Sequence, residues 1–212
     1  MFDQQAGHHV DDAQEALLVD LNQIRHEIIA HSTNSWATSL GYLPVYAAAP
    51  ASRIVIVGQA PGAKAQRSGI PWSDASGAAL RTWLGVSDRQ FYDPDRFALL
   101  PMDFYYPGKG THGDLPPRKA FAPLWHPGIL EQLTNVSLMI LVGTYAQKYY
   151  LRAEAGPTLT ATVRNYRQFV PSRLPLVHPS PLNFRWQKQN PWFAAEVLPL
   201  LRDLVADILG GG

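Results

Sequence analysis

The sequence predicts an α/β fold, in particular a three-layer α/β/α sandwich with a short, mainly four-stranded parallel sheet. Four short apolar runs are continuous rather than alternating, which is typical of strands buried on both faces. Helical patterns separate these runs, and such strand–helix alternation favours a parallel sheet covered on both sides. The four predicted strands are Ile54–Val57, Phe97–Leu100, Leu138–Val142 and Leu174–Val177.

Length and hydrophobic content indicate one domain over residues 1–212. The chain has 212 residues, of which 46% are hydrophobic, enough for a sizeable core. Residues 1–50 are expected to form an N-terminal helix and a connecting segment. The helix is predicted over Asp11–His31, because apolar residues recur there at steps of three and four.

The other helices are placed by capping and turn residues. Serine, threonine and asparagine favour the cap that precedes a helix, proline favours its first turn, and glycine favours its end. These rules predict four further helices. The first is capped by Ser76 and ends at Gly85, and the second starts at Pro127 and runs through Leu133. The third is capped by Thr144 and runs to about Leu151, and the last has Asn190 as its cap, Pro191 in its first turn and its end at Gly210–Gly212.

Charge and cysteine content exclude several classes of function. The chain carries 18 Lys and Arg against 17 Asp and Glu, so nucleic acid would have to meet a local basic patch. There are no cysteines, which excludes disulfides, thiolate catalysis and iron–sulfur clusters. Neither His8–His9 nor His112 forms a convincing metal motif, and we expect no cofactor.

Targeting signals are not evident in this sequence. Met1–Asp12 lacks the apolar stretch of a secretory signal, and the longest apolar run, Val136–Val142, is too short to cross a bilayer. We therefore expect a cytoplasmic protein that does not meet a membrane, and we expect it to be a monomer.

The loop after the first predicted strand is the first candidate binding element. In parallel sheets, ligands bind beyond the carboxyl ends of the strands. Gly58-Gln59-Ala60-Pro61-Gly62 allows close backbone approach at its glycines, and its amides suit an anionic or carbonyl oxygen. It is neither a Walker loop nor a dinucleotide fingerprint. An ordinary strand-to-helix turn is the alternative.

Trp72 follows this loop in a polar segment. A tryptophan directly after a proline is suited to stack on a flat ring. The alternative is a core tryptophan that covers the end of the sheet.

The loop after the last predicted strand is the second candidate. His178-Pro179-Ser180-Pro181 places a proline-restrained histidine where it can donate a hydrogen bond to oxygen charge that develops during bond cleavage. Apolar and basic side chains alternate next, a pattern that fits a nucleic-acid backbone with unstacked bases. The alternative is a connection whose aromatic residues pack beneath the last helix. The alternating residues are Leu182, Phe184, Arg185, Trp186 and Lys188.

Together these motifs resemble the uracil-DNA glycosylase superfamily, in matching order and approximate spacing from about Ile54 to Leu204. The resemblance is closest to the bacterial branch related to the family-four enzymes, which Tyr106–Gly108 and Asp114–Arg118 also resemble. The motifs are Gly58–Gly62, Gly69–Trp72, Leu141–Thr144 and His178–Leu182.

The resemblance implies a base-excision repair activity. Such a protein binds DNA containing a damaged base, flips a deaminated base, uracil or a relative, into a pocket, and hydrolyses its N-glycosidic bond. The reaction needs no metal or organic cofactor. The transition state separates charge, because the sugar becomes oxocarbenium-like while the base leaves as an anion.

The resemblance also assigns roles to individual residues. Backbone near Gly58 and Gln59 and the side chain of His178 would hold the base oxygen, and Trp72 would stack on the base. Leu182 would fill the vacated stack, and Ser180 would touch phosphate. The implied base-binding set is Gly58, Gln59, Ala60, Pro61, Gly62, Trp72 and Met102, and the implied DNA contacts are Ser180, Leu182, Arg185 and Lys188.

The sequence departs from the family pattern at two catalytic positions. Well-characterised members carry a water-organising carboxylate at the second or third position of the first motif, where this chain has Gln59 and Ala60. Asp74 and Asp103 are candidate substitutes, and the alternative for both is a turn or cap carboxylate. The base-reading asparagine is also missing, and residues 100–102 occupy that region.

The missing cysteines are a further departure, because family-four enzymes hold an iron–sulfur cluster with them. Packing of Phe104 and Phe121 is expected to replace that cluster.

Two other functions stay open at this point. A catalytically impaired base- or DNA-binding protein of the same fold is favoured by the missing carboxylate and disfavoured by His178 and Trp72. A small nucleotide-binding α/β protein unrelated to repair is the third reading.

Overall fold

The computed structural model describes residues 20–111 and 113–210 and contains a four-stranded parallel sheet in the order β2-β1-β5-β6. Every pairing in this sheet is parallel, as predicted. Two strands have the predicted bounds, while β2 ends one residue early and β6 is shifted by one residue. The strands are β1 (Ile54–Val57), β2 (Phe97–Leu99), β5 (Leu138–Val142) and β6 (Arg173–Leu176).

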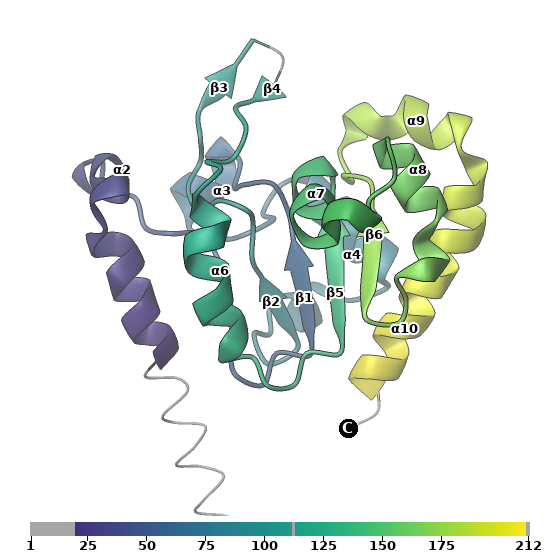
Figure 1. The fold of residues 1–212 in the computed structure, drawn as a ribbon, viewed down its shortest axis with the longest axis horizontal. Helices are drawn as coiled ribbons and strands as arrows, with labels where there is room; N and C mark the ends of the chain where they lie inside the picture. The colour runs from purple at the N-terminus through teal and green to yellow at the C-terminus, as the bar shows by residue number, and fades with distance from the viewer. Residues whose placement is uncertain (1–19, 112, 211–212) are drawn as a thin grey trace, which may run out of the picture.

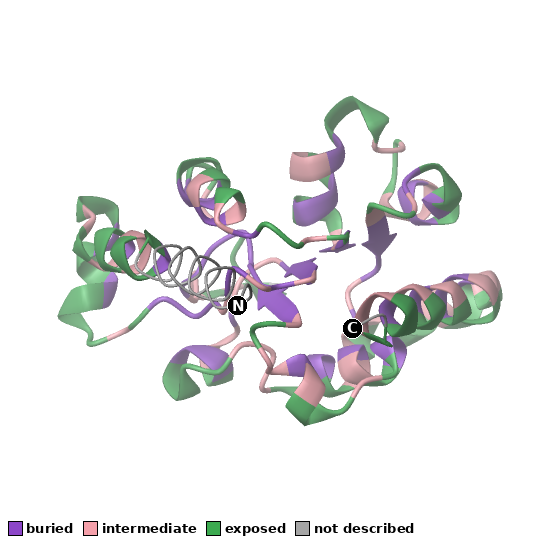
Figure 2. Ribbon diagram, turned by 90° about the horizontal axis from the view of Figure 1, so that it is seen from below, coloured by how far each residue is buried: buried purple, intermediate pink, exposed green. Residues whose placement is uncertain are grey.

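Continuous burial along the strands arises because each face of the sheet has its own hydrophobic core. Ile54 and Ile56 join one core, and Val55 and Val57 join the other. Side chains alternate across a strand, so both parities must be apolar when both faces are covered. Figure 2 shows the buried residues gathered on the strands and on the helix faces turned toward them.

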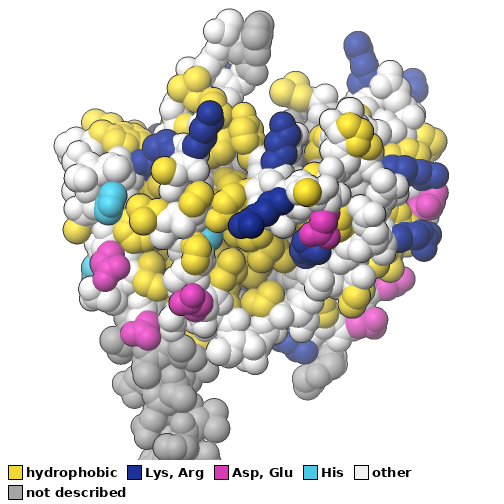
Figure 3. Space-filling model, viewed as in Figure 1, with side chains coloured by type: hydrophobic (Ala, Val, Ile, Leu, Met, Phe, Trp, Pro, Cys, Tyr) yellow, Lys and Arg dark blue, Asp and Glu magenta, His cyan; other side chains and the backbone are white. Residues whose placement is uncertain are grey.

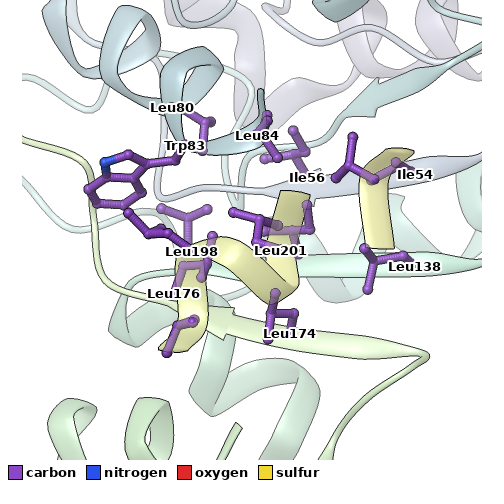
Figure 4. Close-up of a cluster of buried hydrophobic side chains, with 14 of the residues drawn as sticks. Ile54, Ile56, Leu80, Trp83, Leu84, Leu138, Leu174, Leu176, Leu198 and Leu201 are labelled. Atoms are coloured by element: carbon purple, nitrogen blue, oxygen red, sulfur yellow. The ribbon is translucent and has the colours of Figure 1, made fainter. Parts of the chain in front are cut away.

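Helices cover the two faces and complete the three layers (Figure 1). Helices α4 (Ala75–Leu84) and α10 (Leu198–Gly210) pack on one face, where Leu80, Leu84 and Leu201 meet the strand side chains (Figure 4). The N-terminal helix (20–30), α6 (Phe121–Glu131) and α7 (Thr144–Leu151) pack on the other face. The predicted sandwich is therefore confirmed.

Shorter elements fill the connections. A two-stranded antiparallel hairpin, β3 (Lys109–Gly110) with β4 (Gly113–Asp114), projects at the same end of the molecule as the carboxyl ends of the strands (Figure 1). The short helices are α2 (Ser35–Ser39), α3 (Ala63–Ser68), α5 (Asp88–Phe91), α8 (Leu159–Arg164) and α9 (Phe184–Gln189). The other helical turns are η1 (Ser32–Asn34), η2 (Arg152–Glu154), η3 (Tyr166–Gln168), η4 (Pro181–Asn183) and η5 (Phe193–Val197).

Two predicted helix starts are wrong. Asp74, not Ser76, caps α4, because its carboxylate accepts a hydrogen bond from the backbone N–H of Gly77 at 2.9 Å. Helix α6 begins at Phe121, six residues before Pro127, which lies inside the helix. Pro123 occupies the first turn that the prediction assigned to Pro127, and the sequence rule alone does not choose between two such prolines.

Two other helices begin where they were predicted to begin, but the predicted residues do not cap them with their side chains. Thr144 is the first residue of α7, and the cap is Gly143. Asn190 directly precedes the last helix, but its Oδ1 accepts a hydrogen bond from the Trp192 indole at 3.2 Å. For the N-terminal helix, residues 20–30 are helical, and the predicted part from 11 to 19 lies outside the described residues. Within the described residues, no helix combines the length and apolar character needed to cross a membrane.

An ion pair between the buried Asp103 and the partly exposed Arg118 ties the loop after β2 to the N-terminal region. Asp103 is 1% exposed, and its two oxygens accept from Arg118 Nε at 2.7 Å and Nη2 at 2.8 Å. Arg118 Nη1 also donates to Asn34 Oδ1 at 2.7 Å. Beside this pair, Phe104 and Phe121 meet edge to face with ring centroids 5.0 Å apart. The aromatic packing expected for these two residues is therefore present.

His126 forms a second buried polar link, which no motif in the sequence indicates. Its ring nitrogens lie 2.6 Å from the Tyr150 hydroxyl and 3.0 Å from the Pro101 carbonyl oxygen. The carbonyl only accepts, so Nε2 carries the proton and Nδ1 accepts from Tyr150. Burial lowers the pKa of His126 to about 4, although the hydrogen bond to Pro101 opposes this shift.

We predict that His126 makes the fold sensitive to acid. The unfolded chain protonates this histidine near pH 6.5 and the folded chain near 4. Between these values the unfolded state binds more protons, so stability falls as the pH falls, by about 3 kcal/mol in total. Urea denaturation from pH 7 to 4 should show this loss, and His126→Gln should remove that part of it. The exposed His26→Gln serves as the control, and equal pH profiles for wild type and His126→Gln would refute the assignment.

Candidate active site

The loops that follow β1 and β6 meet at the carboxyl ends of these strands, which are separated in the sheet by β5. The rings of Trp72 and His178 stack with their centroids 5.7 Å apart and their planes inclined by 29°. A hollow of about 440 Å³, partly open to solvent, lies among the two loops. It is lined by Val45, Gly58, Gln59, Ala60, Pro61, Gly62, Ala65, Pro71, Trp72, Asp74, Pro101 and His178.

Two backbone carbonyl groups of the loop after β1 accept hydrogen bonds from the loop after β2. Gly58 O accepts from Met102 N at 2.9 Å, and Gln59 O accepts from Asp103 N at 3.2 Å. Across residues 20–111 and 113–210, no hydrogen bond uses the backbone N–H of Gln59 or Ala60. The loop therefore has amide donors available beside the hollow, which suit a carbonyl or anionic oxygen.

The side chain of Gln59 binds away from the sheet. Its Nε2 donates to the carbonyl oxygen of Leu115 at 3.1 Å, just beyond β4. The second residue of the first motif therefore joins the loop to the β3–β4 hairpin.

Trp72 is held in an unusual backbone conformation. Its φ of 55° lies in the left-handed region, which non-glycine residues rarely adopt. Its carbonyl oxygen accepts from Arg81 Nη1 and from the Tyr92 hydroxyl, both at 3.3 Å. A Cβ on Gly77 would lie 1.7 Å from that oxygen, so this helical glycine is required by the approach of Trp72.

A second glycine receives the indole ring itself. A Cβ on Gly58 would lie 2.7 Å from Trp72 Cζ2, which is closer than real contacts allow. Gly58 in the first motif therefore lets the Trp72 ring pack directly against the backbone. The indole forms a wall of the hollow between Gly58 and His178.

His178 follows β6 and is largely shielded from water. Burial lowers the pKa of its imidazole, and the nearby Asp74 opposes this shift. The ring is therefore neutral at neutral pH, with one N–H as a donor. Asn183 Nδ2 donates to the His178 carbonyl oxygen at 2.7 Å and helps to hold the loop.

The structure separates the two candidate carboxylates. Asp74 lines the hollow and uses Oδ1 to cap α4. Asp103 does not line it, because both of its oxygens are taken up by Arg118 and it is 1% exposed. Met102 is also buried outside the lining, and its neighbour Pro101 takes that place.

The predicted DNA-contacting residues lie on η4 and α9. Leu182 is 92% exposed and Phe184 is 71% exposed, whereas Trp186 packs against Phe193 with ring centroids 5.5 Å apart. Arg185 and Lys188 are exposed on α9. Ser180 Oγ accepts from Leu182 N at 3.2 Å, so this hydroxyl caps η4. In Figure 3, many Lys and Arg side chains gather in the upper half of the face, between the hairpin and α9.

Several residues of this site were missed at the level of sequence. Val45 and Pro101 line the hollow from segments that carry no motif. Gly77 and Arg81 hold Trp72 from within a helix, where their spacing is that of an ordinary helix face. The one available signal was Gly77 itself, because a glycine in a helical interior usually has a packing reason.

Residues 44–202 match the uracil DNA glycosylase superfamily. This match spans well over half of the chain, so the protein belongs to that superfamily. A similar solved structure is the solution NMR structure of a candidate uracil DNA glycosylase from Methanosarcina acetivorans, with 16% sequence identity and a TM-score of 0.45. The similarity covers 74% of this chain and 93% of the other.

We predict that Gly77→Ala destabilises the protein. Elsewhere in a helix interior, alanine is more stable than glycine by up to about 1 kcal/mol. Here the new methyl group collides with the Trp72 carbonyl, and such overpacking costs about 1–3 kcal/mol. Urea denaturation followed by circular dichroism measures the difference. Gly210→Ala is the control, since nothing lies within 4 Å of its Cβ position. Equal or higher stability of Gly77→Ala would contradict the proposed packing.

Proposed function

We propose that this protein is a DNA glycosylase that excises uracil or a related deaminated base. The observation that carries the proposal is the stack of Trp72 on His178 beside unused backbone amides. These groups provide a flat wall and hydrogen-bond donors around one hollow. A flipped nucleobase offers the matching flat ring and carbonyl oxygens.

In this proposal, the exposed apolar side chains assist base flipping. Leu182 and Phe184 lie with Arg185 and Lys188 on the consecutive short elements η4 and α9, and all four side chains are exposed. An apolar wedge lowers the cost of unstacking a base, and the cations attract the phosphate backbone. Ser180 is the proposed phosphate contact beside them.

The proposed chemistry is hydrolysis of the N-glycosidic bond. The bond between sugar and base breaks, its electron pair leaves with the base, water adds its oxygen to the sugar carbon, and the proton that this water loses ends on the base. The N–H groups of Gln59 and Ala60 and the neutral His178 would donate to the base oxygen on which negative charge develops. Donors aimed at developing charge are commonly the largest catalytic contribution.

Asp74 is the proposed water-organising carboxylate, and we no longer propose Asp103 for this role. Asp74 lines the hollow and has Oδ2 available when Oδ1 caps α4. Asp103 is buried and paired with Arg118, and moving it into a water-activating role would break this ion pair.

A catalytically impaired base-binding protein is the second candidate. It is favoured by Gln59, whose amide cannot act as a base and is already bound to Leu115 O. The deciding experiment incubates the protein with oligonucleotides containing uracil, hypoxanthine or xanthine and detects alkali-labile abasic sites. Cleavage of any of them supports the glycosylase, and binding without cleavage of all three supports the impaired protein.

The remaining expectations are also parts of this proposal. We propose one domain over residues 1–212, a monomer without a cofactor, and a cytoplasmic location. The relation to the bacterial branch near family four likewise stays a prediction.

We predict that His178→Ala lowers the excision rate about 100- to 1,000-fold, because one oxyanion donor is worth about 2.7–4 kcal/mol. Single-turnover kinetics on a uracil-containing oligonucleotide measure this effect. His26→Ala, at an exposed position, is the control and should cleave at the wild-type rate. A wild-type rate for His178→Ala would remove this residue from the mechanism.

Asp74→Asn is predicted to change both the excision rate and the titration of His178. Loss of the carboxylate removes the interaction that raises the pKa of His178, so that pKa should fall further below 6.5. The NMR signals of the imidazole ring report this shift, and the single-turnover rate should drop in parallel. Asp207→Asn, on the exposed side of α10, should change neither quantity. An unchanged rate in Asp74→Asn would exclude it as the water-organising group.

A further inference from the structure

A second hollow lies next to the candidate active site, beside the β3–β4 hairpin. It is open and mainly apolar, with a volume of about 1060 Å³. We call it the hairpin groove, and its lining is Trp36, Tyr42, Tyr106, Pro107, Gly108, Leu115, Pro116 and Arg118.

Hydrogen bonds join the hairpin groove to the active-site hollow. Gln59, which lines the hollow, donates to the carbonyl oxygen of Leu115, which lines the groove, at 3.1 Å. Gln66 on α3 accepts from Tyr106 N at 2.8 Å and donates to Leu43 O at 2.9 Å. The linings of the two hollows therefore contact each other through Gln59 and Leu115.

Trp36 presents a partly open aromatic face in the groove. It is 40% exposed, and its ring meets Tyr105 edge to face with the centroids 6.0 Å apart. Arg118 lies 5.9 Å from the ring centroid, but its donors are occupied by Asp103, Asn34 and the Thr33 carbonyl. Arg118 thus restrains Trp36 and has little capacity left to bind a ligand.

The rim of the groove carries more accessible positive than negative charge. Within residues 62–69 and 103–120, four cationic side chains are exposed. The same segments contain two carboxylates, of which Asp103 is buried against Arg118. The other, Asp114, accepts from the Tyr106 hydroxyl at 3.3 Å and lies 3.9 Å from Lys109 Nζ, so it partly compensates that cation. The exposed cations are Lys64, Arg67, Lys109 and Lys119.

We propose that the hairpin groove binds an unpaired nucleotide next to the target, with its base stacked on Trp36 and its phosphates near the rim cations. Aromatic faces within a basic groove are the features that bind single-stranded nucleic acid. A base inside a duplex is covered on both faces by its neighbours and cannot stack on Trp36. The inference rests on the proposed function and names its preferred substrate, DNA that is single-stranded beside the damaged base.

The first test measures binding without chemistry. Fluorescence anisotropy gives the Kd of undamaged single-stranded and duplex oligonucleotides of equal length for three variants. Trp36→Leu keeps apolar bulk but lacks the aromatic face, and it should weaken single-strand binding about 5- to 100-fold, since stacking is worth about 1–3 kcal/mol per base. Trp36→Phe should retain most of the affinity. Leu40→Ala, exposed but outside the groove, should bind like the wild type.

A second variant removes a rim cation and keeps the test valid if Trp36 variants fold poorly. This variant is Arg67→Gln, and Arg67 is exposed on α3. It should weaken binding for all sequences and reduce the slope of log Kd against log salt by about one.

The third measurement locates the stacked nucleotide by kinetics. On a single-stranded uracil oligonucleotide, Trp36→Leu should raise KM and leave kcat within about twofold, because the groove touches no reacting atom. Removing flanking nucleotides from one end of the substrate should abolish the difference between Trp36→Leu and wild type, and removing them from the other end should preserve it.

Several results would overturn the inference. These are equal single-strand affinities for wild type and Trp36→Leu, an equal loss on duplex and single strand, or a proline-rich peptide that occupies the groove while oligonucleotides do not. Failure of the proposed function looks different, because no base would be excised while the Trp36-dependent binding of undamaged single strands remained. Excision together with Trp36-independent binding would leave the glycosylase proposal and remove this one.

Discussion

The position of one indole ring is the constraint on which the site depends. Trp72 fits only because Gly58 and Gly77 lack side chains, the first under the ring and the second under the carbonyl oxygen. Arg81 and Tyr92 then hold the left-handed backbone of Trp72 through that oxygen. The loop after β1, helix α4 and the loop after β6 are joined through this residue, since its ring also stacks on the imidazole of the last loop.

Burial around this ring sets the electrostatic character of the site. The imidazole of His178 is desolvated, so its pKa falls and the ring is a neutral hydrogen-bond donor at neutral pH. Behind the hollow, His126 is neutral for the same reason and fastens the Pro101 carbonyl. The buried carboxylate of Asp103 is paired with the partly exposed Arg118, and the largely buried Arg81 is paired with Asp88. Exposed cations lie on the outer rim of the hairpin groove and on α9, where a phosphate backbone can meet them.

Residue roles inferred by order along the chain were less secure than the motifs themselves. Trp72 and His178 could be placed together because both follow buried parallel strands, whose carboxyl ends share one edge. Asp103 and Met102 also follow such a strand, yet both turn into the interior away from the hollow. A position directly after a strand predicts that a residue lies near the site. The direction of its side chain depends on which hydrogen-bond or packing partners it finds in the folded protein.

The amino-acid sequence by itself determined the sheet, its two covered faces and the two loops that form the hollow, because continuous apolar runs and glycine or proline turns are local signals. Tertiary structure alone decided that Asp74 faces the hollow while Asp103 pairs with Arg118, and that Gln59 reaches the hairpin at Leu115. The physical reason is distance along the chain. A carboxylate or amide takes the partner that folding brings within hydrogen-bond reach, and in the last of these contacts the partner is 56 residues away.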